Sequence, residues 1–422
     1  MNFFKPFVYV LLSMPVMICG CYDVFDAKYG INHGRYVITN FGAIGDGDTL
    51  NTSAIQAAID KCSTDGGGVI AVPEGTFLTG SLFFKQNVDL YLEKGAVLKG
   101  TVNPDDYPQV PTRWEGEEMV WTAALVNFND MTDVDITGDG MIDGSGDLWM
   151  QKYPRSTTEL KTGRPRLIAI QNCSDVAVSG FSFMNQACWG LFILYSENVL
   201  VSDLTIRAEH NIISSDGIDV DSCKNVRITG CDIDVNDDCI AIKSGKDEDG
   251  LRVNRPAEDI IVENCRFRYG HGGVSMGSEM SGGIRNVEIR NCVMDSDNWA
   301  PIRFKSQPSR GGVVENITYR DLLLNGTRQA FEFNMAWRMR PPVKPPSDPL
   351  PVVRNIKIIN VSGTVNSVGY IYGLKDSPVK NVTFKNCKIK AVKGIKIENV
   401  DMLNMSGLDI EVEQGEPIIS KD

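Results

Sequence analysis

Residues 215–244 read SDGIDVDSCKNVRITGCDIDVNDDCIAIKS, and this stretch holds the pattern that organises most of the chain. Residues 217–222 and 239–244 each alternate apolar with other side chains and end in serine, and residues 225–233 alternate in the same way between them. Period-two alternation bounded by Asn, Asp and Gly is typical of short strands with one buried face. The stretch therefore predicts three strands joined by tight turns.

The middle phrase of this stretch recurs along the chain. Its copies start about 23 to 42 residues apart, within the range of stacked solenoid units. They occupy residues 133–142, 175–183, 198–206, 225–233, 259–267, 286–294, 316–324, 355–363 and 381–389. Each copy is expected to form one rung of a solenoid.

A second set of strands precedes several of these copies and can be aligned on a shared serine. The residues four and two before each serine are apolar and are expected to face the core, so that the residues between them point outward. The serines are Ser196, Ser222, Ser244, Ser278 and Ser306, and the predicted core residues are Phe192, Leu194, Ile218, Val220, Ile240, Ile242, Val274, Met276, Ile302 and Phe304.

Several strands per turn, in register from turn to turn, favour a parallel β-helix over a propeller or a leucine-rich horseshoe. This all-β solenoid should be right-handed, because parallel crossovers strongly favour that hand. Residues 51–62 have the apolar spacing of a short helix, with Asn51 or Thr52 as its N-cap, which would cover the N-terminal end of the core. The Pro-rich stretch from Arg338 is predicted to be a loop.

The charge composition of the chain excludes one class of binding partner. The 422 residues carry a formal net charge of −12, and no stretch concentrates Lys and Arg, which argues against nucleic acid. A solenoid grows along one axis, so we expect a single catalytic domain over residues 35–422, and we predict a monomer. Four of the eleven cysteines, at Cys231, Cys265, Cys292 and Cys387, occupy one position of the repeat, which predicts a stack of buried thiols.

Residues 1–21 have the layout of an export signal, with Lys5 followed by an apolar run and then small residues. Cys21 lies in a sequence that resembles a bacterial lipobox, and a lipid on Cys21 would be the protein's contact with a membrane. We therefore expect an exported protein: a periplasmic or outer-membrane lipoprotein if it is bacterial, and a secreted protein otherwise.

The turns that enter the serine-ended strands carry the candidate chemistry. Six residues before the serine, Asp216 and Asp238 occupy neighbouring rungs, and seven residues before it stand Asp237 and His271. Rungs lie about 4.8 Å apart, so these four groups should converge. Crowded carboxylates differ in pKa, which is what a glycosidase requires of its acid and its base.

Other side chains at these turns and strands would bind the substrate. Arg303, Lys305 and Lys243 point outward and can hold the carboxylate of an acidic sugar. Trp189 and Trp299 either line the groove or pack locally.

Two other interpretations of the acidic residues stay open. Any one aspartate can be explained by a turn. A Ca²⁺ site can be assembled from Asp216, Asp219, Asp221 and Asp238, although two adjacent cations disfavour it, and Asp219 and Asp221 can be simply solvated. We predict no metal and no cofactor.

Four motifs carry a resemblance to a known family: Ser214-Ser215-Asp216, Asp237-Asp238, Gly270-His271-Gly272 and Arg303-Phe304-Lys305. In this order they resemble the Asn-Thr-Asp, Asp-Asp, Gly-His-Gly and Arg-Ile-Lys motifs of glycoside hydrolase family 28, the polygalacturonase family. The resemblance extends from about Ile38 to about Lys390 and implies a right-handed parallel β-helix that hydrolyses galacturonic-acid-containing pectin with inversion and without a cofactor.

The resemblance also implies a role for each residue. Asp237 would be the general acid, and Asp216 with Asp238 would orient and deprotonate water. His271 would support protonation of the acid, and Arg303 with Lys305 would bind the uronate. Inversion would require the acid and the base to lie about 6.5 to 9.5 Å apart. Ser215 departs from the family's Asn-Thr pair at a position expected to face the groove, so the sugar contact there should differ.

The substrate and the mode of attack stay open between several alternatives. The first is a polygalacturonase-like hydrolase, with exo action as a possibility. Within the same family stand a rhamnogalacturonan hydrolase and a side-chain galacturonidase. Outside it stand a pectate lyase and a non-catalytic β-helix carbohydrate-binding protein.

Overall fold

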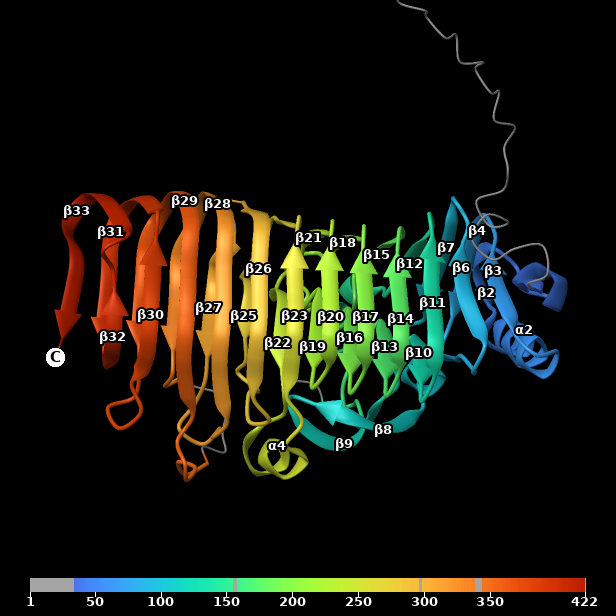
Figure 1. Ribbon diagram of the computed structural model, residues 1–422. Coiled ribbons are helices and arrows are strands. Elements are labelled where there is room, and N and C mark those ends of the chain that lie inside the picture. The colour runs from blue at the N-terminus through green and yellow to red at the C-terminus, as the bar shows by residue number, and fades with distance from the viewer. Residues whose placement is uncertain (1–33, 155–157, 296–297, 338–343, 422) are drawn as a thin grey trace, which may run out of the picture.

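The computed structural model describes residues 34–154, 158–295, 298–337 and 344–421. Within these ranges, strands from successive turns pair in parallel and form one continuous sheet that coils about a long axis (Figure 1). The coil is right-handed, which confirms the predicted parallel β-helix. The predicted export signal with Cys21, and residues 338–343 of the predicted loop, lie outside the described residues. In the described part, no helix has the length and apolar character needed to cross a membrane.

Each turn places strands on up to three faces of the coil. The groove face, which carries the candidate site, contains β5 (Leu82–Phe83), β10 (Val126–Asn129), β13 (Ile168–Gln171), β16 (Leu191–Leu194), β19 (Ile218–Asp221), β22 (Asp238–Lys243), β25 (Gly270–Met276) and β27 (Asn298–Lys305). The second face contains β1 (Arg35–Val37), β3 (Gly68–Val72), β6 (Val88–Leu92), β11 (Thr132–Gly138), β14 (Ser174–Ser179), β17 (Glu197–Ser202), β20 (Lys224–Thr229), β23 (Ala257–Glu263), β26 (Ile284–Met294), β30 (Val379–Lys385) and β32 (Val400–Asn404). The third face contains β2 (Asp46–Leu50), β4 (Gly75–Thr79), β7 (Ala96–Gly100), β12 (Met141–Asp143), β15 (Ser182–Met184), β18 (Thr205–Arg207), β21 (Asp232–Asp234) and β24 (Arg266–Phe267).

Toward the C-terminus the turns become smoother, and single strands continue from one face onto the next. The first is β26, whose last residues pair with β24 on the third face. The others are β28 (Val313–Asn334), β29 (Val352–Tyr372), β31 (Cys387–Glu398) and β33 (Leu408–Lys421). Their last segments extend the groove face beyond β27, because Arg303 pairs with Glu332 and Glu332 pairs with Tyr370.

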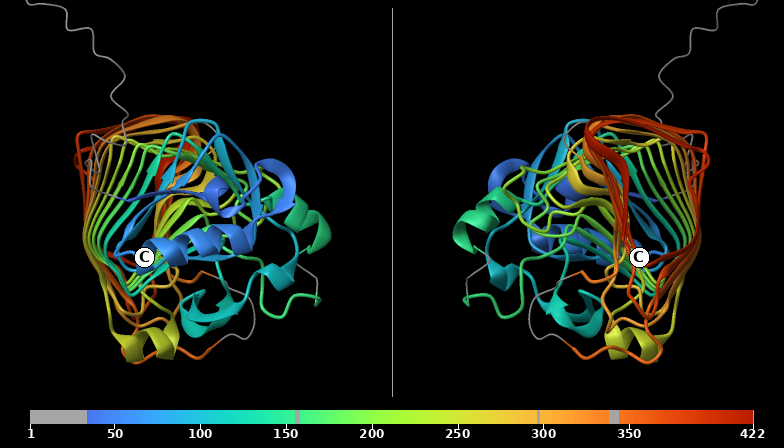
Figure 2. Two further views of the ribbon diagram at one scale, coloured as in Figure 1. Left: turned by 90° about the vertical axis from the view of Figure 1, so that its right-hand side faces the viewer. Right: turned by 90° about the vertical axis from the view of Figure 1, so that its left-hand side faces the viewer.

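The predicted capping helix is α2 (Thr52–Thr64), which lies at the N-terminal end of the coil (Figure 2). Ile55, Ala58, Ile59 and Cys62 are its buried side chains, as the spacing predicts. Asn51 stands at the N-cap but its side chain makes no capping bond. Its amide instead bonds the backbone of Ile44 and Thr49, so it fixes the chain that leads into the helix.

Several elements were not predicted. They are the helices α3 (Gly146–Lys152) and α4 (Asp247–Val253), the 3₁₀ turns η1 (Ile38–Phe41) and η2 (Pro104–Asp106), and an antiparallel hairpin of β8 (Gln109–Trp114) and β9 (Glu117–Thr122). The hairpin and α4 lie together beside the groove face (Figure 1).

The predicted register is confirmed for four serine-ended strands and wrong for the first. Ile218, Ile240, Val274 and Ile302 pair in sequence and face the core. In β16, however, Leu191 pairs with Ile218 and Ile193 with Val220, so these two residues enter the core instead of Phe192 and Leu194.

The error in β16 has a physical cause. Phe192 and Leu194 point outward and pack with Trp189 and Trp114 of the hairpin. Both faces of this strand are therefore covered. Residues 191–194 are therefore all apolar and show no alternation. The predicted register of β16 depended on Ser196 alone, and Ser196 is one residue out of line with the serines of the later strands.

The cysteines are structural. All nine in the described residues are unpaired and buried. Cys231, Cys265 and Cys292 are stack neighbours, and the column continues through Leu322 and Val361 to Cys387. Because Leu322 and Val361 occupy the same column as the cysteines, we infer that the thiols pack there as apolar side chains.

Candidate active site

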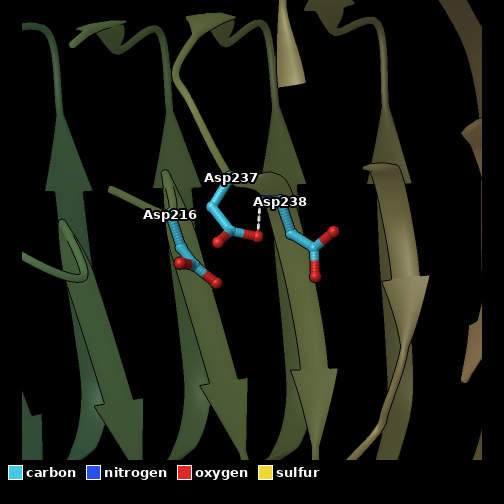
Figure 3. Close-up of side chains that lie close together, drawn as sticks. All are labelled: Asp216, Asp237 and Asp238. Atoms are coloured by element: carbon cyan, nitrogen blue, oxygen red, sulfur yellow. Dashed lines mark hydrogen bonds between the residues drawn. The ribbon is translucent and has the colours of Figure 1, made fainter. Parts of the chain in front are cut away.

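Three aspartates meet on the groove face at the start of neighbouring strands (Figure 3). Asp216 precedes β19, Asp237 precedes β22, and Asp238 is the first residue of β22. An oxygen from each carboxylate lies within 4.8 Å of an oxygen of the other two. The backbone N–H of Asp238 donates to Oδ1 of Asp237 at 3.0 Å, which holds the two adjacent carboxylates at a fixed angle.

Two cations from β27, two rungs farther along the coil, bind Asp238. Lys305 Nζ donates to Oδ2 at 2.6 Å, and Arg303 Nη1 donates to Oδ1 at 3.1 Å. Between these rungs stands Gly272, whose added Cβ would lie 2.7 Å from Asp238 Oδ1 and 3.3 Å from Arg303 Cδ. A side chain at this position would therefore disturb the contact between Asp238 and Arg303.

These neighbours separate the protonation states of the carboxyls. Burial raises the pKa of Asp238, but Lys305 and Arg303 outweigh burial and hold it well below its usual value. Burial, Asp219 and Asp237 raise the pKa of Asp216 well above its usual value. Neighbouring carboxyls of the cluster therefore differ in their affinity for a proton, which is the difference that acid–base hydrolysis needs.

His271 contacts the carboxylate of Asp237. Its Nδ1 lies 3.3 Å from Asp237 Oδ1. Burial raises the pKa of Asp237, but the bond from His271 lowers it overall, and the same bond raises the pKa of His271. The proton of the pair therefore rests on the imidazole in the free site, one bond away from the carboxyl that would deliver it.

The pH dependence of activity should report this pair. The raised pKa of His271 means that the pair keeps its proton until the pH rises through that value, which sets the alkaline limb of the kcat profile. In His271→Gln the proton must come from the Asp237 carboxyl, which titrates lower. We expect the alkaline limb to move toward acid by at least about one pH unit, with kcat lower on the order of a hundredfold at neutral pH. An unmoved limb in the variant's pH profile would assign that limb to another group.

The carboxylate cluster has the oxygen ligands of a cation site. However, both oxygens of Asp238 already accept bonds from Lys305 and Arg303. A divalent ion there would have to displace two positive side chains, so the donor set fits a metal poorly.

Lys243 also lines the pocket, but its ammonium group already lies near two carboxylates and an aromatic ring. Its Nζ lies 3.2 Å from Asp219 Oδ1, 3.7 Å from Glu279 Oε2 and 4.1 Å from the centre of the Trp189 ring. Solvation was one alternative for Asp219 and Asp221, and both are buried. Burial raises the pKa of Asp219 to about 7, and Asp221 lies against Arg113 of the hairpin.

Ser215 is placed differently from the expectation, and Trp189 combines the two alternatives left open for it. Ser215 has no exposed surface, and its hydroxyl donates to the carbonyl of Ile212 and accepts from the N–H of Asn236, so it tightens the turn and contacts no groove. Trp189 borders the pocket but is only 4% exposed, because Trp114 stacks on it at 4.5 Å. Trp299 is 39% exposed and does line the groove.

The catalytic pocket, with a volume of about 860 Å³, surrounds the cluster and includes residues that were not predicted. Glu115 and Glu117 come from the hairpin, Lys246 and Asp247 from the start of α4, and Lys344 from the chain before β29. Glu117 links them, at 3.3 Å from Lys246 Nζ and 3.6 Å from Lys344 Nζ. The sequence signal that could have indicated this hairpin is the dipeptide Glu115-Gly116. In the structure its φ angles of 42° and 84° form the tight turn between β8 and β9.

The separation of the carboxylates contradicts one expectation. An acid and a base about 6.5 to 9.5 Å apart were anticipated for inversion, whereas one oxygen of each carboxylate lies within 4.8 Å of an oxygen of the other two. The cause is the rung spacing, since Asp216 and Asp238 start neighbouring strands and Asp237 adjoins Asp238. Inversion is thus supported by resemblance and not by this distance.

Comparison with known proteins identifies the family. The model of glycosyl hydrolases family 28 matches residues 62–408, a span that contains all four motifs and the whole carboxylate cluster. The chain belongs to glycosyl hydrolases family 28. The predicted family and the prediction of a glycoside hydrolase are thereby confirmed.

Several named proteins are similar to this chain. A probable polygalacturonase of Vitis vinifera is 32% identical over 374 residues, which cover 85% of this chain and 75% of the relative. An exo-poly-alpha-D-galacturonosidase of Dickeya chrysanthemi is 31% identical over 67% of this chain and 54% of its own length. The crystal structure of a hyperthermoactive exopolygalacturonase from Thermotoga maritima superposes with a TM-score of 0.76 at 30% identity, covering 88% of this chain and 92% of that one.

Proposed function

We propose that this glycoside hydrolase removes galacturonic acid from the end of galacturonic-acid chains of pectin. The observation that supports this most directly is Asp238, which is held ionised by Lys305 and Arg303 while it lies next to Asp216 and Asp237. The same two cations that tune the catalytic carboxylate are within reach of a uronate carboxylate in the pocket, so an acidic sugar would be selected where the bond is cleaved.

Each carboxyl takes a role in this proposal. Asp237, supplied with a proton by His271, protonates the oxygen of the leaving sugar. Ionised Asp238 accepts a proton from the attacking water, and Asp216 orients that water from the neighbouring rung. The oxygen of water becomes bound to the sugar carbon as the glycosidic bond breaks, and inversion follows if water attacks from the opposite side.

The packing on the groove face supports the exo action that we propose. On the N-terminal side of Asp216, the rings of Trp121, Trp114 and Trp189 form a continuous stack, with successive centroids 4.3 and 4.5 Å apart. Arg166 lies 5.0 Å from the Trp189 ring. We infer that this stack ends the groove, so that only the last sugar of the chain fits beyond the scissile bond.

The test is product analysis on defined oligogalacturonates with a label at the reducing end. We expect single galacturonic acid units from the first minutes, a ladder of labelled products shortened one unit at a time, and full activity in chelator without ultraviolet-absorbing unsaturated products. Proton NMR of the first product gives its anomeric configuration.

Each other outcome selects another enzyme. Internal cuts from the start contradict exo action, and cleavage only of rhamnose-containing oligosaccharides indicates a rhamnogalacturonan hydrolase. Unsaturated products that require Ca²⁺ indicate a lyase. Binding without any product indicates a non-catalytic protein.

We also propose export, on the strength of the charged, apolar and small-residue order in residues 1–21. Mass measurement of the mature N-terminus checks this proposal. A protein that begins at a lipid-modified Cys21 supports the lipoprotein alternative, and retention of Met1 contradicts export.

A further inference from the structure

A second pocket lies on the groove face, farther toward the C-terminus than the carboxylate cluster. We call it the distal pocket; it has a volume of about 800 Å³ and is bordered by β27, β28, β29, β31 and β33. Its principal side chains are Trp299, Arg328, Tyr370, Tyr372, Lys393 and Lys396. Trp299 also lines the catalytic pocket, so the two hollows adjoin.

Strand register places the distal pocket in line with the catalytic cations. Arg303 pairs with Glu332, Glu332 with Tyr370, and Tyr370 with Lys396. Three rung steps therefore separate Arg303 from Lys396, or about 14 Å along the coil axis. Tyr372 stands two rungs beyond Lys305 in the same manner. A linear polymer that leaves the catalytic pocket in this direction passes over these side chains.

The charge of the distal pocket is positive on an acidic protein. Three cations, Arg328, Lys393 and Lys396, line it against one acid, Glu416. Among the described residues these three cations make no ion pair, so their charges are available to a ligand. In a chain of net charge −12, such a grouping favours an anion.

The aromatic side chains supply flat surfaces for sugar rings. Trp299 is 39% exposed, and the Arg328 guanidinium lies 5.3 Å from its centre. Tyr370 and Tyr372 stack on each other at 4.5 Å, and the hydroxyl of Tyr370 donates to Glu332, which fixes the ring. Aromatic faces with nearby cations suit a pyranose that carries a carboxylate.

We propose that the distal pocket binds uronate residues of the polysaccharide chain whose end is hydrolysed in the catalytic pocket. This inference rests on the proposed function and deepens it, because it assigns a binding site for sugars several units away from the cleaved bond. Binding there raises the local concentration of chain ends at the catalytic pocket. The enzyme should consequently prefer long chains over short ones.

The test compares two double variants on the same strand, β31. In Lys393→Gln/Lys396→Gln, both distal lysines lose their charge. The matched control is Lys388→Gln/Lys390→Gln, which removes the same charge outside the pocket, where the lysines face Asp409 and Glu411. We expect the distal variant to raise KM for polygalacturonate at least about tenfold with kcat unchanged, and to leave both constants for digalacturonate as in the parent. The control should match the parent on both substrates.

A second measurement separates this inference from the proposed function. In the Asp237→Asn background, polygalacturonate binding is measured by calorimetry with and without the distal substitutions. Weaker binding only with the distal pair supports the site even if no galacturonan is hydrolysed. If the distal and the control double variants weaken binding equally, the effect is general electrostatics. If the distal double variant raises KM for digalacturonate as much as for polygalacturonate, Lys393 and Lys396 act in the catalytic pocket. Either result overturns the proposal.

Discussion

Asp237→Asn is expected to lower kcat on polygalacturonate on the order of a thousandfold while the protein stays folded. The amide has the same shape, and its oxygen can still accept the bond from the Asp238 N–H, which is 3.0 Å long in the parent. It cannot donate a proton to the leaving oxygen. The variant should therefore lose protonation of the leaving group and keep substrate binding, so KM should change little.

A substrate with an activated leaving group tests this assignment sharply. Nitrophenolate departs without protonation, so Asp237→Asn should lose much less activity on 4-nitrophenyl galacturonide than on the polymer. Asp238→Asn should lose activity on both, because it removes the base. If the two variants respond alike, or if Asp216→Asn shows the leaving-group effect instead, then the acid is not Asp237.

Asp234→Asn is the matched control for Asp237→Asn. Asp234 also binds a histidine, with His210 Nε2 at 2.7 Å from its Oδ1, and it lies outside the catalytic pocket. Its substitution breaks an equivalent Asp–His pair at the end of β21, where Asp234 is half-buried. We expect activity within twofold of the parent, which would show that the loss in Asp237→Asn comes from the chemistry and not from a broken pair.

Arg113→Met is expected to lower the free energy of unfolding by about 3–5 kcal/mol, because it leaves the Asp221 carboxylate buried and unpaired. Arg113 is fully buried, and its Nη1 donates to Asp221 Oδ1 at 2.7 Å and to Ser222 Oγ at 2.8 Å. This contact ties the hairpin to the coil. Loosening the hairpin should also uncover the groove face beyond Asp216, so internal cuts should appear among the products.

Urea unfolding and product analysis check the two parts of this prediction. Asp221→Asn added to Arg113→Met should recover much of the lost stability, since the uncompensated charge is gone. The control Arg252→Met removes an exposed arginine that pairs with Glu118 of the same hairpin, and it should cost at most about 1 kcal/mol. Equal losses from Arg113→Met and Arg252→Met would contradict the importance of the buried pair, and single-unit products from Arg113→Met would mean that the hairpin does not block the groove.

Much of the site could be predicted because it depends on local repetition. Asp216, Asp237, Asp238, His271, Arg303 and Lys305 all stand at fixed offsets from a serine in a repeat, and in a parallel coil equal offsets become spatial neighbours. Ser215 was misplaced because an offset gives the rung of a side chain but not its direction within a tight turn. There, the hydroxyl found a backbone partner at Ile212.

The register predicted for the first serine-ended strand, β16, was wrong for a different reason. Its residues Phe192 and Leu194 are apolar because a hairpin from far upstream covers them, and no signal within the strand reveals that partner. The same hairpin explains the burial of Asp221 and supplies Glu117 to the pocket. One unpredicted contact therefore accounts for several separate errors.

The sequence by itself determined the coil, its rung-to-rung register over most of the groove face, and the identity of the acidic and basic groups that meet there, because all of these follow from short-range periodicity. The tertiary structure decided the charged neighbours of the carboxyls, the packing of the hairpin against the groove face and the existence of the distal pocket. Those depend on distances between side chains that are remote in the chain, and electrostatic and packing energies change steeply with such distances.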